Sequence, residues 1–169
     1  MVVPKKIPAK YVNQLNSELS KNQDTIFYQK KKFTGYVFGQ FSGGDTAFVE
    51  GYYHGLLEGI THKWYPNKQL MEERLFINNH KEGIHKGWWP DGKPKFIFEV
   101  SNDEYVGFYK EWYSNGHLAR CFHYKNGQEE GSEKMWWDNG KIRANYVIIN
   151  GEKFGLSGQK LCINKNLKE

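Results

Sequence analysis

The sequence has few cysteines, few prolines and no long hydrophobic run. Its 169 residues include two cysteines, Cys121 and Cys162, and five prolines. The cysteines do not stand at a CxxC or Cys/His spacing, so no zinc site is indicated. No run of about 18 apolar residues exists, so no membrane-spanning helix is predicted. The first ten residues, MVVPKKIPAK, also lack the apolar centre of a signal peptide.

Composition favours a turn-rich β protein with a thin, aromatic core. Only 38% of residues are hydrophobic, while 17% are aromatic and 18 are glycines. The net charge of +5 permits an acidic partner without requiring one. The only run of three cations is Lys30–Lys32, which is sparse for nucleic-acid binding, so a nucleic-acid partner is not expected.

Glycine and tryptophan recur with a period of 24 residues, and such a period must be identified before any other fold is considered. The repeat glycines are Gly35, Gly59, Gly83, Gly107, Gly131 and Gly155. Five residues after four of them stand Trp64, Trp88, Trp112 and Trp136, and the next residues are Tyr65, Trp89, Tyr113 and Trp137. All six tryptophans therefore fall in two columns of the repeat, which coincidental spacing does not explain.

Two turn signals divide each unit into two strands. The first follows the aromatic pair, at Pro66-Asn67-Lys68, Asp91-Gly92, Asn115-Gly116 and Asn139-Gly140. The second follows about eleven residues later, at Asn78-Asn79, Asn102-Asp103, Asn126-Gly127 and Asn150-Gly151. Asn-Gly and Asp-Gly pairs favour type I′ hairpin turns. Each unit is therefore predicted to be one β-hairpin with strands of about six to eight residues, rich in β-branched and aromatic residues.

The flanks are atypical copies, as expected for the ends of a repeat array. The unit at Gly35 lacks tryptophan, and the segment from Gly155 is interpreted as a terminal cap whose Lys165, Lys168 and Glu169 protect the sheet edge. Val12, Leu15 and Leu19 stand at helical spacing, so a short capping helix is predicted over residues 9–20, with Thr25–Gln29 as a first strand. The predicted organisation is a tail and capping helix in residues 1–24 and one repeat domain in residues 25–169.

The unit G-x4-W-[YW]-x-[ND]-G-[KHQ]-[LIP] resembles the variant form of the MORN (membrane occupation and recognition nexus) repeat over residues 35–155. The copies at Gly35 and Gly155 depart from the pattern, and Lys68 stands where the turn glycine is expected. The resemblance implies an all-β, elongated antiparallel meander of stacked hairpins with a binding role. It also implies a bacterial protein of the kind often labelled as an antitoxin. Because some similar proteins are exported or lipid-anchored, a cell-envelope location is slightly favoured over a cytoplasmic one.

No residue pattern indicates catalysis. The six histidines form no ligand spacing, and Glu72-Glu73 and Glu129-Glu130 are adjacent, so their side chains point apart. Cys121 and His123 share a strand face, but a packed thiol beside a surface histidine explains that pair. Cys121 and Cys162 belong to different units, so we expect free thiols. The protein is therefore predicted to be no enzyme and to need no cofactor or metal.

The candidate partner-binding residues lie in two columns that share a strand face. Three residues after the repeat glycines come cations, two positions before the first tryptophan column; the set is His62, Lys86, Lys110 and Lys134 with Trp64, Trp88, Trp112 and Trp136. Aligned cations and indoles suit an acidic protein partner, although aromatic ladders that hold a thin sheet together, with lysine stems over the rings, also explain both columns. The predicted function is protein–protein interaction, as scaffold, adaptor or immunity-type inhibitor. The alternative is a module for an envelope component: phospholipid headgroup, glycan or peptidoglycan.

Overall fold

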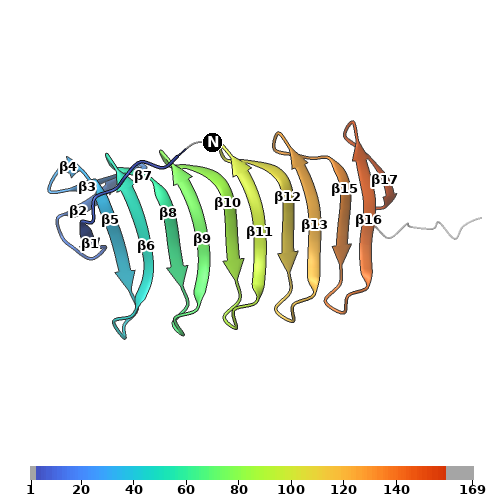
Figure 1. The fold of residues 1–169 in the computed structure, drawn as a ribbon, viewed down its shortest axis with the longest axis horizontal. Helices are drawn as coiled ribbons and strands as arrows, with labels where there is room; N and C mark the ends of the chain where they lie inside the picture. Colours follow the sequence, from blue (N-terminus) through green and yellow to red (C-terminus); the bar gives the residue numbers. More distant parts are fainter. Residues whose placement is uncertain (1–2, 159–169) are drawn as a thin grey trace, which may run out of the picture.

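The repeat units form one long β-sheet. A computed structural model describes residues 3–158, and every regular element in this range is a strand. Figure 1 shows the strands side by side in a single extended row. In spatial order the repeat strands are β5 (Gly35–Gln40), β6 (Thr46–Tyr53), β8 (Gly59–Trp64), β9 (Leu70–Ile77), β10 (His80–Trp88), β11 (Pro94–Ser101), β12 (Glu104–Trp112), β13 (Leu118–Lys125), β15 (Gly131–Trp136), β16 (Ile142–Ile149) and β17 (Glu152–Leu156). Each pairs antiparallel with the next, which confirms the predicted meander.

The first turn of each unit differs from the type I′ turn expected at the Asn-Gly pairs, whereas the second turn has the positive φ values of that type. In Asn115-Gly116 only the glycine has a positive φ, of 90°, and its N–H donates to the carbonyl of Tyr113 at 2.9 Å. This is the geometry of a type I turn followed by a left-handed residue, so the type I′ prediction is wrong at this end of the hairpin. The second turn does have two positive φ values, as at Asn78 (49°) and Asn79 (71°). Asparagine is used at the first turn because its side chain caps the loop: Asn115 Oδ1 accepts from the N–H of His117 at 2.9 Å.

One face of the sheet, here called the inner face, carries most of the buried residues of the repeats. Its pairs are complementary in size across neighbouring strands. Gly87 lies opposite Phe96, and a Cβ at Gly87 would lie 2.3 Å from the ring of Phe96, so glycine makes room for the aromatic side chain. In the first hairpin, formed by β5 and β6, Gly39 and Phe48 repeat this arrangement, with 2.2 Å to the ring. The single-layer sheet therefore builds its core from its own cross-strand pairs.

The capping helix predicted over residues 9–20 is absent. Instead β1 (Tyr11–Asn13) pairs parallel with β5, and a turn leads to β2 (Leu19–Asn22). The side chain of Asn13 accepts the N–H of Leu15 at 2.9 Å, which gives the chain a turn in place of helical hydrogen bonds. Val12 is 5% exposed but Leu15 is 84% exposed, so the helical spacing of these residues does not describe a common buried face.

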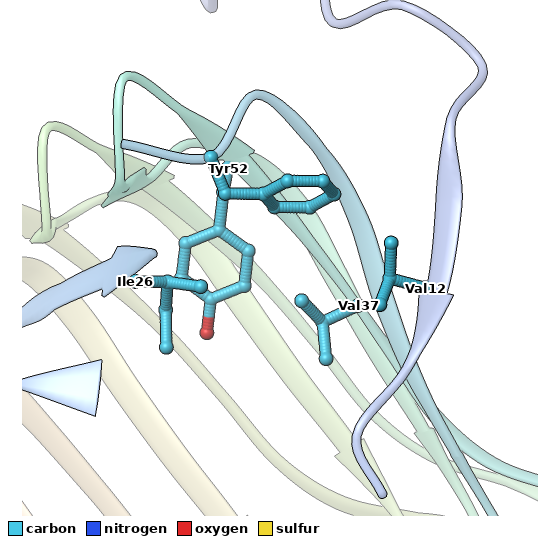
Figure 2. Packing of buried hydrophobic residues seen from close by; sticks show 5 residues of the cluster. Val12, Ile26, Val37 and Tyr52 are labelled. Atoms are coloured by element: carbon cyan, nitrogen blue, oxygen red, sulfur yellow. The ribbon is translucent and has the colours of Figure 1, made fainter. Parts of the chain in front are cut away.

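The N-terminal end of the main sheet is covered by a second, three-stranded sheet. It comprises β2, β3 (Thr25–Tyr28) and β4 (Lys31–Lys32), so the strand predicted at Thr25–Gln29 exists but belongs to this small sheet. Figure 2 shows Val12, Ile26, Val37 and Tyr52 packed where the two sheets meet. The Ile26 N–H donates to the carbonyl of Gly55 at 2.9 Å, which joins the small sheet to the first hairpin. This cluster is the largest apolar core among the described residues.

Short segments complete the ends of the sheet. The residues ahead of β1 run along the strand ends in Figure 1, where the Lys5 N–H donates to Glu58 at 2.8 Å and Lys5 Nζ to Asn78 at 2.6 Å. β7 (Leu56–Leu57) pairs with β6, and β14 (Gln128–Glu129) pairs with β13. Cys162, Lys165, Lys168 and Glu169 lie outside the described residues, so the terminal cap and the pairing of Cys162 stay predictions.

Candidate binding face

The cations predicted from the sequence lie in one continuous row on the face opposite to the inner face, here called the outer face. The backbone register places each residue of the row directly beside the next, from β6 to β16. We call this set the cation row: Val49, His62, Glu73, Lys86, Ile97, Lys110, Cys121, Lys134 and Asn145. The 24-residue period thus becomes a spacing of two strands, about 10 Å, between successive cations.

The cation row is electrostatically uneven. Glu73 lies between His62 and Lys86, and its carboxylate oxygens are 3.4 Å from His62 Nε2 and 3.6 Å from Lys86 Nζ. Lys110 and Lys134 form no ion pair with any residue in the range 3–158. Their cross-strand neighbours are Ile97, Cys121 and Asn145, none of which is charged. The uncompensated positive charge of the row therefore lies over β12 to β15.

The first tryptophan column forms a second row on the same face, here called the tryptophan row. Each indole faces an apolar residue of the paired strand, and the pairs are Trp64–Leu70, Trp88–Pro94, Trp112–Leu118 and Trp136–Ile142. The ring of His62 stacks on Trp64 with centroids 5.6 Å apart, which places the two predicted columns on one face. The four indoles are half-buried. A shallow pocket of about 170 Å³ lies between Trp88 and Trp112.

A third row on the outer face consists of exposed apolar side chains that the sequence reasoning did not single out. These residues directly follow the repeat glycines: Ile60, Ile84 and Phe108 are 49%, 52% and 63% exposed. They lie two residues before the cation row, just as the tryptophans lie two residues after it. The outer face thus has a positively charged centre with apolar side chains on both sides. The sequence signal for the third row is that an apolar residue directly follows the repeat glycine in three units.

The second aromatic column has a structural role, and it acts through hydrogen bonds between units that the sequence analysis did not predict. Its polar atoms reach the next unit and donate to the carbonyl of the following tryptophan. The hydrogen bonds are Tyr65 Oη to Trp88 O at 3.0 Å, Trp89 Nε1 to Trp112 O at 3.2 Å and Tyr113 Oη to Trp136 O at 2.9 Å. Tyrosine and tryptophan alternate in this column because both present an aromatic body with a donor at its end. The column connects neighbouring hairpins.

The inner face has its own column of polar residues, two positions after the four central repeat glycines Gly59, Gly83, Gly107 and Gly131. Thr61, His85 and Glu133 of this column are buried, and Tyr109 is half-buried. Burial and the neighbouring Arg74 guanidinium lower the pKa of His85 from 6.5. Burial raises the pKa of Glu133 from 4.5 to about 7, although the backbone N–H of His123 donates to both of its oxygens. Because Thr61, His85 and Glu133 are buried, their side chains are not accessible to a macromolecular partner.

One pair of ionisable side chains joins two neighbouring units at their turns. His80 Nδ1 lies 2.6 Å from Asp103 Oδ2, and the second oxygen of Asp103 accepts the Lys81 N–H at 2.8 Å. This pair lies at a turn and stabilises the link between two units. Within residues 3–158 no three His, Cys, Asp or Glu side chains are close enough together to hold a metal ion. The same range contains no helix that is long and apolar enough to cross a membrane.

The register, the turns and the links between units define a tandem β-hairpin repeat protein with one charged, aromatic outer face. The family profile described as MORN repeat variant matches residues 57–78 and 106–126, which include the hairpin turns after Trp64 and Trp112. These two segments are therefore similar to MORN repeats, and this repeat is a binding module that contacts proteins or membrane lipids. A search of curated proteins found no match to the chain.

Proposed function

We propose that this protein is a non-catalytic binding module whose outer face binds an acidic protein partner. The observation that carries the proposal is the cation row, which runs beside the tryptophan row across four units. Aromatic side chains supply most of the binding energy at protein interfaces, and lysines raise the rate of encounter with an acidic surface. Within this class the partner's identity decides whether the module acts as a scaffold, an adaptor or an inhibitor of the antitoxin or immunity type.

The test reverses the charge of the row and measures capture of the native partner. The triple variant Lys86→Glu, Lys110→Glu and Lys134→Glu should fold with only a modest loss of stability. Lys110 and Lys134 form no ion pair within residues 3–158, and a single surface pair such as Lys86–Glu73 contributes little. The variant should nevertheless lose the proteins that the wild-type chain retains from a lysate of its source cells. Thermal unfolding of both proteins is the control for folding. If the folded variant retains the same proteins with the same yield at low salt, the outer face is not the interface and the proposal is wrong.

The wild-type chain and the triple variant also distinguish an envelope ligand from a protein partner. A wild-type chain that binds anionic vesicles, peptidoglycan or glycan but retains no protein from the lysate would favour the alternative. The gene context gives a second criterion for the inhibitor role: a neighbouring toxin that is neutralised when both genes are expressed would support it. The geometry favours the protein partner because Glu73 interrupts the positive charge that a flat anionic surface would meet.

A further inference from the structure

The part of the outer face that is best suited to an acidic partner lies over β12 to β16. Here Lys110 and Lys134 flank Cys121 in the cation row, and neither has an ion-pair partner in residues 3–158. On one side of them are Trp112 and Trp136, which belong to the tryptophan row. A partner that fits this surface must place two carboxylates opposite the two lysines and an apolar edge against the indoles.

Exposed apolar side chains continue this surface on both sides of the lysines. Phe108 stands on the side away from the indoles and is 63% exposed, and Val147 of β16 is also exposed. Ile142 lies opposite Trp136 and is 54% exposed. Apolar residues that are exposed beside aligned cations mark an interaction surface rather than an ordinary solvated sheet face.

The spacing of the lysines selects the backbone conformation of the partner. Lys110 and Lys134 are two strands apart, which corresponds to about 10 Å across the sheet. In an extended segment, residues on one face recur at about 7 Å and about 13 Å, and residues about 10 Å apart point to opposite faces. In an α-helix, residues seven positions apart lie about 10.5 Å apart on the same face. A helix therefore matches the two-strand period, whereas an added or docked β-strand does not.

We infer that the outer face of β12 to β16 binds an acidic amphipathic α-helix that crosses the strands, with carboxylates seven residues apart over Lys110 and Lys134. The inference rests on the proposed function and specifies its partner. Apolar residues three or four positions after each carboxylate lie on the same helical face, and they meet Trp112 and Trp136. The contacts do not extend to Lys86 of β10, because Glu73 lies beside that lysine and pairs with it.

A lipid surface fits these observations less well. A flat bilayer would contact the whole outer face, including Glu73 in the cation row and the exposed Glu99, which lies opposite Ile84. Both carboxylates would be repelled by anionic headgroups. A helix is about 10–12 Å wide and can lie over the part of the face that lacks them.

The experiment uses the full chain and a synthetic helical peptide of about three heptads, with glutamates seven residues apart and leucines between them on the same face. A fluorescently labelled peptide titrated at low salt should bind and become helical in circular dichroism. A second peptide of the same composition, with the glutamates five residues apart, should bind at least about tenfold more weakly, because its carboxylates cannot face both lysines at once. A third peptide, with two prolines in its centre, should not bind.

The variant Lys110→Glu/Lys134→Glu should weaken binding of the first peptide by about tenfold or more. The matched control is Lys31→Glu/Lys63→Glu, which makes the same charge change at exposed lysines outside the outer face and should alter affinity by less than about twofold. Equal binding of the two helical peptides, or tighter binding of the proline peptide, overturns the inference. So does binding of anionic phosphatidylglycerol vesicles, lost in the Lys110/Lys134 variant, without binding of any peptide.

Capture of the native partner distinguishes failure of the proposed function from failure of the helical-partner inference. If the Lys110/Lys134 variant loses its native protein partner while the helical peptide never binds, the proposed function stands and the helical partner is wrong. If the variant retains the native partner unchanged, both are wrong.

Discussion

The buried Glu133 provides the sharpest test of the inner face. This residue of β15 has an exposed fraction of 0%, and its two carboxylate oxygens accept the backbone N–H of His123 at 3.2 and 3.3 Å. The backbone hydrogen bond and Lys153 favour the charged form, but burial and the charge of Glu129 outweigh them and raise the pKa to about 7. At neutral pH and above, folding therefore forces a charge into a site that disfavours it.

The sign of the pH dependence follows from proton binding in the two states. In the unfolded chain the carboxyl group has its ordinary pKa of 4.5, whereas in the folded chain it keeps its proton up to about pH 7. Between these values the folded state binds more protons, so the free energy of unfolding falls as pH rises, and the loss is complete above the folded pKa. Over the interval from 4.5 to about 7, at about 1.4 kcal/mol per pH unit, the effect amounts to roughly 3 kcal/mol.

Glu133→Gln removes this penalty because glutamine cannot ionise and its amide oxygen still accepts the N–H of His123. We expect the variant to have a free energy of unfolding about 2–3 kcal/mol higher than the wild type at pH 8, and nearly equal to it at pH 4.5. Urea denaturation followed by tryptophan fluorescence from pH 4.5 to 8.5 measures the difference. Glu104→Gln, at the exposed first residue of β12, is the control and should follow the wild-type curve. Parallel curves for Glu133→Gln and the wild type would refute the reasoning.

Three further predictions concern the inner face and the links between units. His85→Phe should become more stable relative to the wild type as pH falls through 6.5, because the lowered pKa of buried His85 makes the unfolded chain bind the extra proton; the same urea series would show a constant difference if this is wrong. Tyr113→Phe should lower the free energy of unfolding by about 1 kcal/mol in calorimetry, since the hydroxyl that donates to the Trp136 carbonyl is lost. Gly87→Ala should cost about 1–3 kcal/mol because its Cβ would lie 2.3 Å from the ring of Phe96, and an unchanged melting temperature would contradict that contact.

The repeat array could be predicted from the sequence because its signals are local and periodic. A glycine every 24 residues, tryptophan five residues later and two turn signals per unit set strand number and order. The N-terminal segment carries no such period, and the spacing of Val12 and Leu15 was wrongly interpreted as helical. At this end of the main sheet, β5 has unpaired backbone N–H and carbonyl groups along its edge, and β1 forms hydrogen bonds with them. This pairing is more favourable than an isolated helix of about three turns, because a helix that short is only marginally stable.

The candidate face could be predicted in part. The shared face of the cation and tryptophan columns follows from strand alternation, so His62 and Trp64 were placed correctly relative to one another. The neutralisation of His62 and Lys86 by Glu73 was not foreseen, because it depends on which residue of the neighbouring strand lies opposite. That register is set by bulges and turn geometry rather than by the period alone.

A comparison of the two faces within the chain favours a function on the outer one. The residues of the inner column are buried, so folding restricts which side chains fit there most strongly. The column nevertheless contains different residue types, Thr61, His85 and Glu133, and burial of the last two lowers the stability of the fold at a pH where they carry a charge.

On the outer face, the charges of surface lysines contribute little to folding, and nothing in the sheet requires a lysine at a given offset. Lysine nevertheless occupies the same offset in three successive units, at Lys86, Lys110 and Lys134. The proposed helical partner would account for this regularity, because the seven-residue spacing of a helix matches the two-strand period of the lysines.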